Sequence, residues 1–448
     1  MTQPTENKKN EWCFTNFELF EKSLNGGSTS HIHAIRKAAM ERFAKLGFPT
    51  SRDEEWRFTN VSPIASSNFK PVLDYISNQV TIKSLQSHLV DGMGSTRLVF
   101  INGHFSPDLS VFGSFSNGVK VGNLSTALER ENGFVNQYLT RYAGYDDNAF
   151  TALNTGFLYD GAFVFIPDGL ELDDPIYLVF ISTEFDGTFV SHPRNLIVAG
   201  RNAEVKVVEH YLGLAKSSYF TNAVTEIVAG QHSIVEHTKL QSESLKAYHI
   251  GSTYVHQDAA SNVTSHSISF GGMLVRNNIT AVLAAEGCEC MLNGLSLSTG
   301  QQHIDNHTTI DHAKPHCNSH ELYKSIIDGK SKGVFNGKIL VRKDAQKTDA
   351  KQTNKTLLLS DNATMNTKPQ LEIFADDVKC THGATVGYLD AEALFYLRSR
   401  GIGVDAARDM LTYAFANDVT DRTKIEGFRE YLNNMLHARL EQGRRTEG

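Results

Sequence analysis

Residues 376–402 read DDVKCTHGATVGYLDAEALFYLRSRGI, and the period of this stretch changes halfway. The first half alternates, so that Cys380 and His382 fall on the same side of an extended strand. The second half has helical spacing, with Asp390 as a good N-cap and Gly401 at the end of the helix. We therefore expect a strand that carries a cysteine and a histidine and that leads directly into a helix.

The spacing of the Cys-x-His pair is compatible with binding a metal ion or an iron–sulfur cluster. Residues i and i+2 of a strand point to the same face and lie roughly 6.5–7 Å apart. Cys380 and His382 would then offer a thiolate and an imidazole side by side, a combination that suits iron, zinc or an iron–sulfur cluster. The alternative is a half-buried strand in which the cysteine packs and the histidine forms hydrogen bonds.

The middle of the chain consists of short β-branched runs separated by glycine, asparagine and aspartate. Its turn signals recur about every 27–30 residues, a period typical of stacked coils. No helices of useful length separate the runs, which leaves an antiparallel sandwich or a β-solenoid, and the regular period favours the solenoid. The recurring turns fall at 200–203, 230–233, 259–262 and 286–288.

Changes in composition divide the chain into three regions. We predict a mainly helical N-terminal region over 1–147, a β-solenoid core over 148–388 and a C-terminal helical domain over 389–448. Helical spacing of apolar residues falls at 14–24, 33–46, 124–142, 390–401, 404–414 and 425–440.

The bulk composition excludes several classes of protein. The chain has 448 residues, a net charge of −7 and no long basic run, which argues against a nucleic-acid partner. Its five cysteines form no paired framework, as is typical of a reducing compartment. No apolar run approaches the roughly 18 residues that span a bilayer, and the N-terminus has no signal-peptide pattern. We expect a cytoplasmic protein with no membrane partner.

The densest set of potential metal ligands lies within 303–320. His303, Asp305 and His307 could share one strand face, but no ordered motif of three or four ligands follows, so a polar solenoid face is the favoured interpretation. Paired acids such as those at 173–174 could act in a glycosidase or a polysaccharide lyase, but solvated turn residues explain them more simply.

Two further patterns do not predict a functional site. Cys288 and Cys290 alternate in an apolar context, which predicts buried residues of a coil. The tripeptide at 329–331 is similar to the end of a phosphate-binding loop, but the first glycine of that motif would fall at Lys324. We therefore expect no nucleotide-hydrolysing site in this chain.

Several stretches resemble the SufD family, the scaffold subunits of the SUF system for iron–sulfur cluster assembly. The most specific is 333–402, which contains the Cys-x-His motif, and the resemblance extends to 150–180, 193–211 and, more weakly, 47–60. It covers nearly the whole chain. It implies a mainly β fold: a right-handed parallel β-helix core, flanked by a mixed helical N-terminal region and a C-terminal helical domain.

The resemblance also implies partners. Family members pair through their β-helices with a second scaffold subunit, SufB, and each binds the ATPase SufC through its C-terminal helices, here 390–416 and 421–440. Without its partner, the chain could form a homodimer through an exposed edge of the solenoid. SufB-type chains carry an essential cysteine in the stretch that matches 352–358, which here reads QTNKTLL.

Matched to the family motif, His382 is the expected ligand of iron or of the cluster, and Cys380 is the second candidate. The iron–sulfur cluster or iron would be transient and shared with SufB, and we expect no tightly bound cofactor in the isolated chain. The prediction is a non-catalytic scaffold. The alternative is a β-helix enzyme, either carbohydrate-active or a metal-dependent hydrolase.

Overall fold

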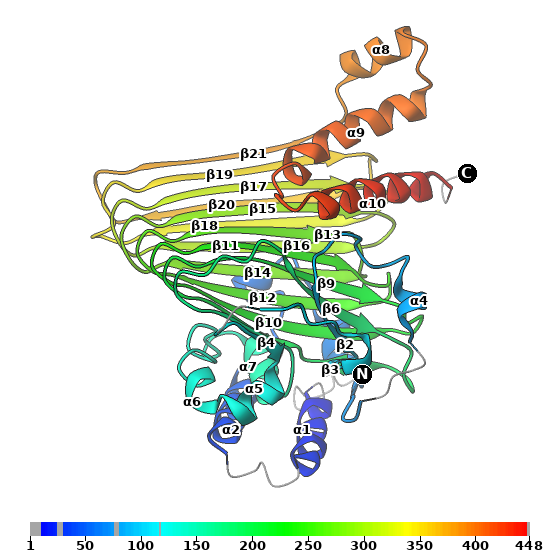
Figure 1. Ribbon diagram of the computed structural model, residues 1–448. Coiled ribbons are helices and arrows are strands. Elements are labelled where there is room, and N and C mark those ends of the chain that lie inside the picture. The colour runs from blue at the N-terminus through cyan, green and yellow to red at the C-terminus, as the bar shows by residue number, and fades with distance from the viewer. Residues whose placement is uncertain (1–9, 25–29, 76–79, 116–117, 446–448) are drawn as a thin grey trace.

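The computed structural model describes residues 10–24, 30–75, 80–115 and 118–445, and its body is a parallel β-solenoid of about eight turns (Figure 1). Each turn adds one strand to each of two sheets, which we call sheet A and sheet B. The strands of successive turns pair in parallel; among the described strands, β2 pairs antiparallel with β3 and β4 with β5, both at the N-terminal end. The expected solenoid is therefore confirmed, and the antiparallel sandwich is excluded.

The strands of each sheet follow one another along the solenoid axis. Sheet A contains β4 (Lys120–Asn123), β5 (Ala162–Ile166), β8 (Arg194–Ala199), β10 (Tyr219–Ala229), β12 (Tyr248–Gln257), β14 (Leu274–Leu283), β16 (His303–His312), β18 (Lys332–Val341) and β20 (Thr364–Ile373), with β1 (Lys70–Pro71) and β7 (Phe189–Ser191) beside them. Sheet B contains β3 (His104–Phe105), β2 (Thr96–Ile101), β6 (Ile176–Ser182), β9 (Glu204–Gly213), β11 (Ile234–Ser242), β13 (Asn262–Ser269), β15 (Glu289–Ser298), β17 (Asn318–Ile327), β19 (Asp349–Leu358) and β21 (Lys379–Gly387).

One corner of the solenoid explains the period seen in the sequence. At this corner each coil places one residue in the left-handed backbone conformation, so that the chain can turn sharply from sheet A into sheet B. Only one of these residues is a glycine. Backbone hydrogen bonds to the next turn of the stack hold the other five residues in this conformation. The six residues are Asn202, His232, Ala260, Gly287, His316 and Lys347, at intervals of 27–31 residues.

The interior of the solenoid combines apolar and polar side chains. Aliphatic side chains such as Val205 and Val207 fill part of the early coils. Inward positions of sheet B also hold buried polar side chains, from Glu209, which lies 3.0 Å from His237 Nε2 in the early coils, to Glu321 and Gln352 in the last ones.

Helices cover the N-terminal end of the solenoid (Figure 1). An aromatic-rich cluster joins α1 (Glu11–Ser23), α2 (His31–Leu46) and α7 (Ala149–Gly156) to sheet A. The expected helical stretch at 124–142 is only partly helical: it forms two short helices separated at Glu131, and residues 136–142 form turns. The short helical elements of this region are η3 (Glu54–Trp56), α3 (Ser62–Ser66), α4 (Ile82–Leu85), η4 (Pro107–Leu109), α5 (Leu124–Arg130) and α6 (Asn132–Val135).

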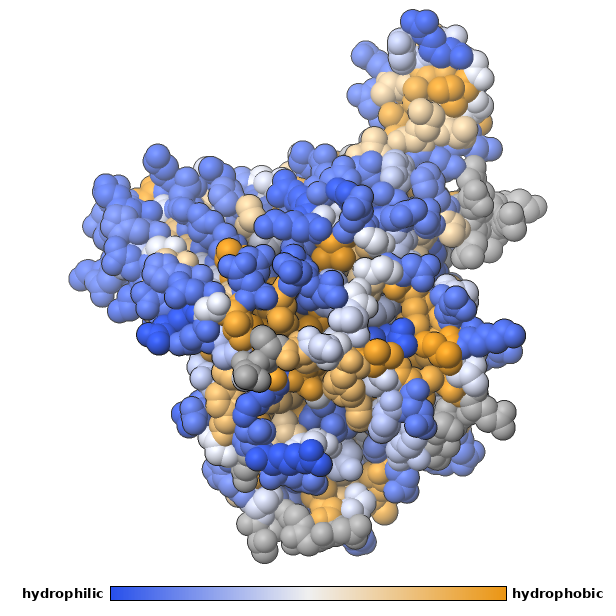
Figure 2. Space-filling model, viewed as in Figure 1, coloured by the Kyte–Doolittle hydropathy of each residue, from blue (hydrophilic) through white to orange (hydrophobic). Residues whose placement is uncertain are grey.

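The C-terminal helices α9 (Val404–Thr420) and α10 (Glu426–Arg445) pack on the outer face of sheet B. Phe428 and Leu436 of α10 are fully buried there, and Lys324 of β17 forms an ion pair with Asp418 of α9. Helix α8 (Ala391–Ser399) contains no buried residue and projects from the body beyond β21, where hydrophobic side chains are visible on its surface (Figures 1 and 2). Within the described residues, no helix has both the length and the hydropathy that a membrane span requires.

Candidate functional site

The solenoid ends in an open coil formed by β20 and β21. Each of these strands has a neighbour on one side only, β18 and β19 respectively, so the outer edge of each sheet is unpaired. No described segment covers this end, because the chain leaves β21 through α8, which projects outward (Figure 1). Phe374 and Tyr388, next to the two strands, are 63% and 62% exposed. The open end thus combines free backbone hydrogen-bonding groups with exposed aromatic side chains.

Cys380 and His382 lie on β21, in this last coil. They pair in register with Ala350 and Gln352 of β19, whose side chains are buried inside the solenoid. By the alternation of the strand, Cys380 and His382 therefore occupy inward positions, and no further coil covers them. The structure brings the two predicted residues together on one face of one strand.

The two side chains differ in exposure. His382 is exposed, whereas Cys380 is half-buried and packs against the small apolar cluster that includes Ala350. Burial and the nearby Asp349 carboxylate raise the pKa of the Cys380 thiol. In the free chain this thiol is therefore protonated at neutral pH, and a metal ion would have to displace its proton.

A polar column that the sequence did not reveal continues inward from His382. Register pairs Glu321 of β17 with Gln352, and Gln352 with His382, so three successive coils stack these side chains. The Gln352 amide donates a 2.6 Å hydrogen bond to the Glu321 carboxylate. Gly337 makes room for this amide, since a Cβ there would lie 2.3 Å from Gln352 Nε2. Burial raises the pKa of Glu321 to about 7.

The side chains of the histidine-rich set are bonded to one another and to the N-terminal region. His303, Asp305 and His307 point outward from β16, as their spacing predicts, and Asp305 accepts hydrogen bonds from Thr59 (2.5 Å) and Arg276 (3.0 Å). Burial alone would raise the pKa of Asp305, but the facing charges of His307 and Arg276 hold it well below its ordinary value. No group of three or more histidine, cysteine, aspartate or glutamate side chains among the described residues could hold a metal ion.

The same set instead fastens the N-terminal region to sheet A. Trp56 of η3 stacks on the Arg276 guanidinium, whose carbon lies 3.7 Å from the ring centroid. The neighbouring Glu55 carboxylate lies 3.3 Å from His307 Nδ1, and that hydrogen bond, in spite of partial burial, lowers the pKa of Glu55. Asn336 of β18 donates a further hydrogen bond to Glu55. These contacts support the interpretation of the set as a structural polar face.

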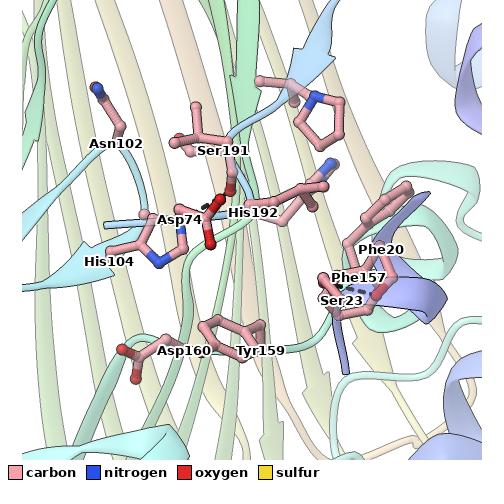
Figure 3. A pocket seen from close by; sticks show the side chains of 15 residues that line it. Phe20, Ser23, Asp74, Asn102, His104, Phe157, Tyr159, Asp160, Ser191 and His192 are labelled. Atoms are coloured by element: carbon pink, nitrogen blue, oxygen red, sulfur yellow. Dashed lines mark hydrogen bonds between the residues drawn. The ribbon is translucent and has the colours of Figure 1, made fainter. Parts of the chain in front are cut away.

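Two cavities lie away from the Cys-x-His pair. One, of about 210 Å³, is at the N-terminal end, where Phe20 and Phe157 lie on one side and Asn102 and His104 on the other (Figure 3). The other is a groove of about 710 Å³ on the outer face of sheet A, beside Trp56. Neither cavity is lined by Cys380 or His382.

The open coil, its Cys-x-His pair and the helices beyond it define a β-solenoid whose last coil presents a cysteine and a histidine at an open end. The model of the SUF system FeS cluster assembly SufBD core domain matches residues 180–415, and that of the SufBD protein N-terminal region matches residues 8–178. The chain therefore belongs to the SufBD family of iron–sulfur cluster assembly proteins.

Relatives of the same family match over most of the chain. An iron–sulfur cluster assembly SufBD family protein of Synechocystis is 33% identical, with 93% of each chain covered. The iron–sulfur cluster assembly protein SufD of Escherichia coli is 32% identical over 91% of this chain and 92% of its own length. A chloroplast protein of Arabidopsis thaliana is 30% identical over 94% of this chain and 90% of its own length.

Proposed function

We propose that this chain is a SufD-type scaffold subunit that pairs with a SufB-like paralogue through its open coil. The observation that carries this proposal is the position of Cys380 and His382, on the inward face of a terminal strand with an unpaired edge. A partner solenoid that pairs with β20 and β21 would satisfy the free backbone groups and enclose both side chains.

His382 is the proposed first ligand for the cargo, which is iron or a nascent iron–sulfur cluster, and Cys380 is the second. A neutral imidazole and a thiolate together suit ferrous iron and iron–sulfur centres. Two ligands leave most of the coordination sphere open, so the partner would supply the others and the cargo could leave again. In this proposal the chain binds its cargo without turnover, in the cytoplasm.

The energy for assembly would come from a SufC-type ATPase that docks on the C-terminal helices. Helix α8 supports this part of the proposal, since Phe395 and Tyr396 are 73% and 57% exposed on an element without buried residues. In a chain studied without its partners, the same open coil would pair with a second copy, which gives the proposed homodimer.

The test is anaerobic cluster reconstitution of this chain together with its SufB-type and SufC-type partners. His382→Ala should leave the three subunits co-eluting but lower the iron and sulfide retained after desalting. Thr381→Ala, on the opposite face of the same strand, is the matched control and should retain the wild-type content. Unchanged iron and sulfide in His382→Ala would remove this residue from the site. Failure of the wild-type subunits to associate would overturn the pairing itself.

A further inference from the structure

One inward position at the solenoid corner holds a small side chain in successive coils. It directly follows the residue with the left-handed backbone, and its side chain lies beneath the turn. Ser261 donates to the carbonyl oxygen three residues earlier (2.6 Å), and Thr348 does the same (2.9 Å). Two coils place cysteine at this position instead of a hydroxyl residue. The occupants of the six coils are Ala203, Ser233, Ser261, Cys288, Cys317 and Thr348.

The two cysteines of the corner lie against each other. Cys288 and Cys317 directly precede the paired residues Glu289 and Asn318, and the Asn318 amide donates a 2.9 Å hydrogen bond to the Cys288 carbonyl oxygen. Neighbouring parallel strands are about 4.8 Å apart, within the range of roughly 4.4–6.8 Å over which a disulfide joins two Cα atoms. Both sulfur atoms approach the same oxygen, that of Ala285, at 3.2 Å for Cys288 and 3.3 Å for Cys317. Both side chains are fully buried.

The corner also favours ionisation of one thiol. A hydrogen bond from Cys317 stabilises the Cys288 thiolate and, against the effect of burial, lowers the pKa of Cys288 to about 7. The same bond and burial raise the pKa of Cys317. Burial raises the pKa of the other two buried thiols, Cys13 and Cys290. The corner pair is thus a nucleophile beside a protonated partner, which is the arrangement that thiol oxidation requires.

We propose that Cys288 and Cys317 form a peroxide-reactive dithiol that closes to a disulfide between adjacent coils. The Cys288 thiolate attacks one oxygen of a hydroperoxide, the O–O bond breaks, and the leaving oxygen takes a proton to form water or an alcohol. The sulfur of Cys317 then attacks the sulfur of the resulting sulfenic acid, the S–O bond breaks, the hydroxyl group leaves as water with the Cys317 proton, and the S–S bond forms. The peroxide is reduced by two electrons, and the two thiols are oxidised by two.

The turns that cover the pair are themselves partly exposed. The turns above it expose Glu286 and His316, whose side chains lie 3.7 Å apart. Hydrogen peroxide is close to water in size, so a local opening of this corner admits it while the solenoid stays folded. The disulfide would join residues that the stacked turns already hold together, so the fold needs no rearrangement to accept it.

The test is exposure of the full chain to hydrogen peroxide, followed by thiol blocking under denaturing conditions and peptide mass spectrometry. Cleavage after Glu289 separates Cys288 from Cys290, and a second cleavage before Asp305 or Asp311 separates Cys290 from Cys317, so that the linked peptides identify the partners. We expect one intramolecular Cys288–Cys317 disulfide per chain, reversed by a thiol reductant. Cys290→Ser should form it as the wild type does, whereas Cys288→Ser and Cys317→Ser should not.

The serine variants suit this test, because serine already occupies the same corner in two other coils. The wild type and Cys290→Ser decide the question even if a corner variant fails to fold. Persistence of all thiols at a peroxide excess that oxidises free cysteine would overturn the proposal. A disulfide to Cys290, or one between two chains, would also overturn it.

Discussion

Glu321 gives the most direct test of the polar interior beneath the candidate site. Its carboxyl group is only 3% exposed, and burial raises its pKa from the ordinary value of 4.5 to about 7. Between these two values the folded chain keeps the proton while the unfolded chain loses it. The unfolded state then binds fewer protons, so the stability of the folded chain falls as the pH rises through this interval.

The size of this effect follows from the two pKa values. One pH unit within the interval changes the free energy of unfolding by about 1.4 kcal/mol, so that Glu321 removes about 3 kcal/mol in all between pH 4.5 and pH 7. Below the interval both states are protonated, and above it both are ionised, so no further loss occurs on either side. Glu321→Gln retains the shape and the amide contact to Gln352 but cannot ionise.

The assay is urea unfolding of wild type and Glu321→Gln from about pH 5 to about pH 8, with the difference in unfolding free energy plotted against pH. We expect the variant to gain about 3 kcal/mol on the wild type across this range, most of it below pH 7. Glu129→Gln, at an exposed position, is the control and should show a flat difference. A flat difference for Glu321→Gln would refute the argument, because it would mean that the carboxyl group is solvated in the folded chain.

Two further predictions concern the ends of the solenoid. Glu226→Ala should lower the free energy of unfolding by about 3–5 kcal/mol, because it removes the carboxylate that lies 2.6 Å from the buried Arg194 guanidinium. Urea unfolding measures this loss, and a loss below about 1 kcal/mol would contradict the prediction. The double variant Phe395→Ser, Tyr396→Ser should leave the unfolding temperature unchanged but weaken co-elution with the SufC-type ATPase. Arg398→Gln is its control on the same helix, and undiminished binding by the double variant would exclude α8 as the docking element.

The solenoid was predictable because it repeats. The turn at 200–203 returns at 230–233 and again at 259–262, and the structure stacks these turns at one corner. The sequence did not predict that the helical stretch at 124–142 is interrupted at Glu131 and ends at Val135, since apolar spacing continues across both positions. The sequence signal for the end of a helix is weaker than the apolar periodicity on either side of it.

The candidate site was predictable only in part. The strand spacing placed Cys380 and His382 on one face, which the register with Ala350 and Gln352 supports. Glu321 escaped notice because no local pattern links it to the motif. Its neighbours in the column lie about one coil apart along the chain, and only the register between successive strands brings them together.

Exposure of the motif follows from where the solenoid stops. An inward residue of an inner coil is sealed by the coils above and below, as Ala350 and Gln352 are. The same inward position in the last coil has no cover, so His382 is exposed although its strand has the alternation of a buried one. A single-sequence pattern reports which face a side chain occupies, whereas exposure depends on whether another coil follows. A partner that supplies this coil would convert an exposed imidazole into an enclosed ligand without any change in the fold of this chain.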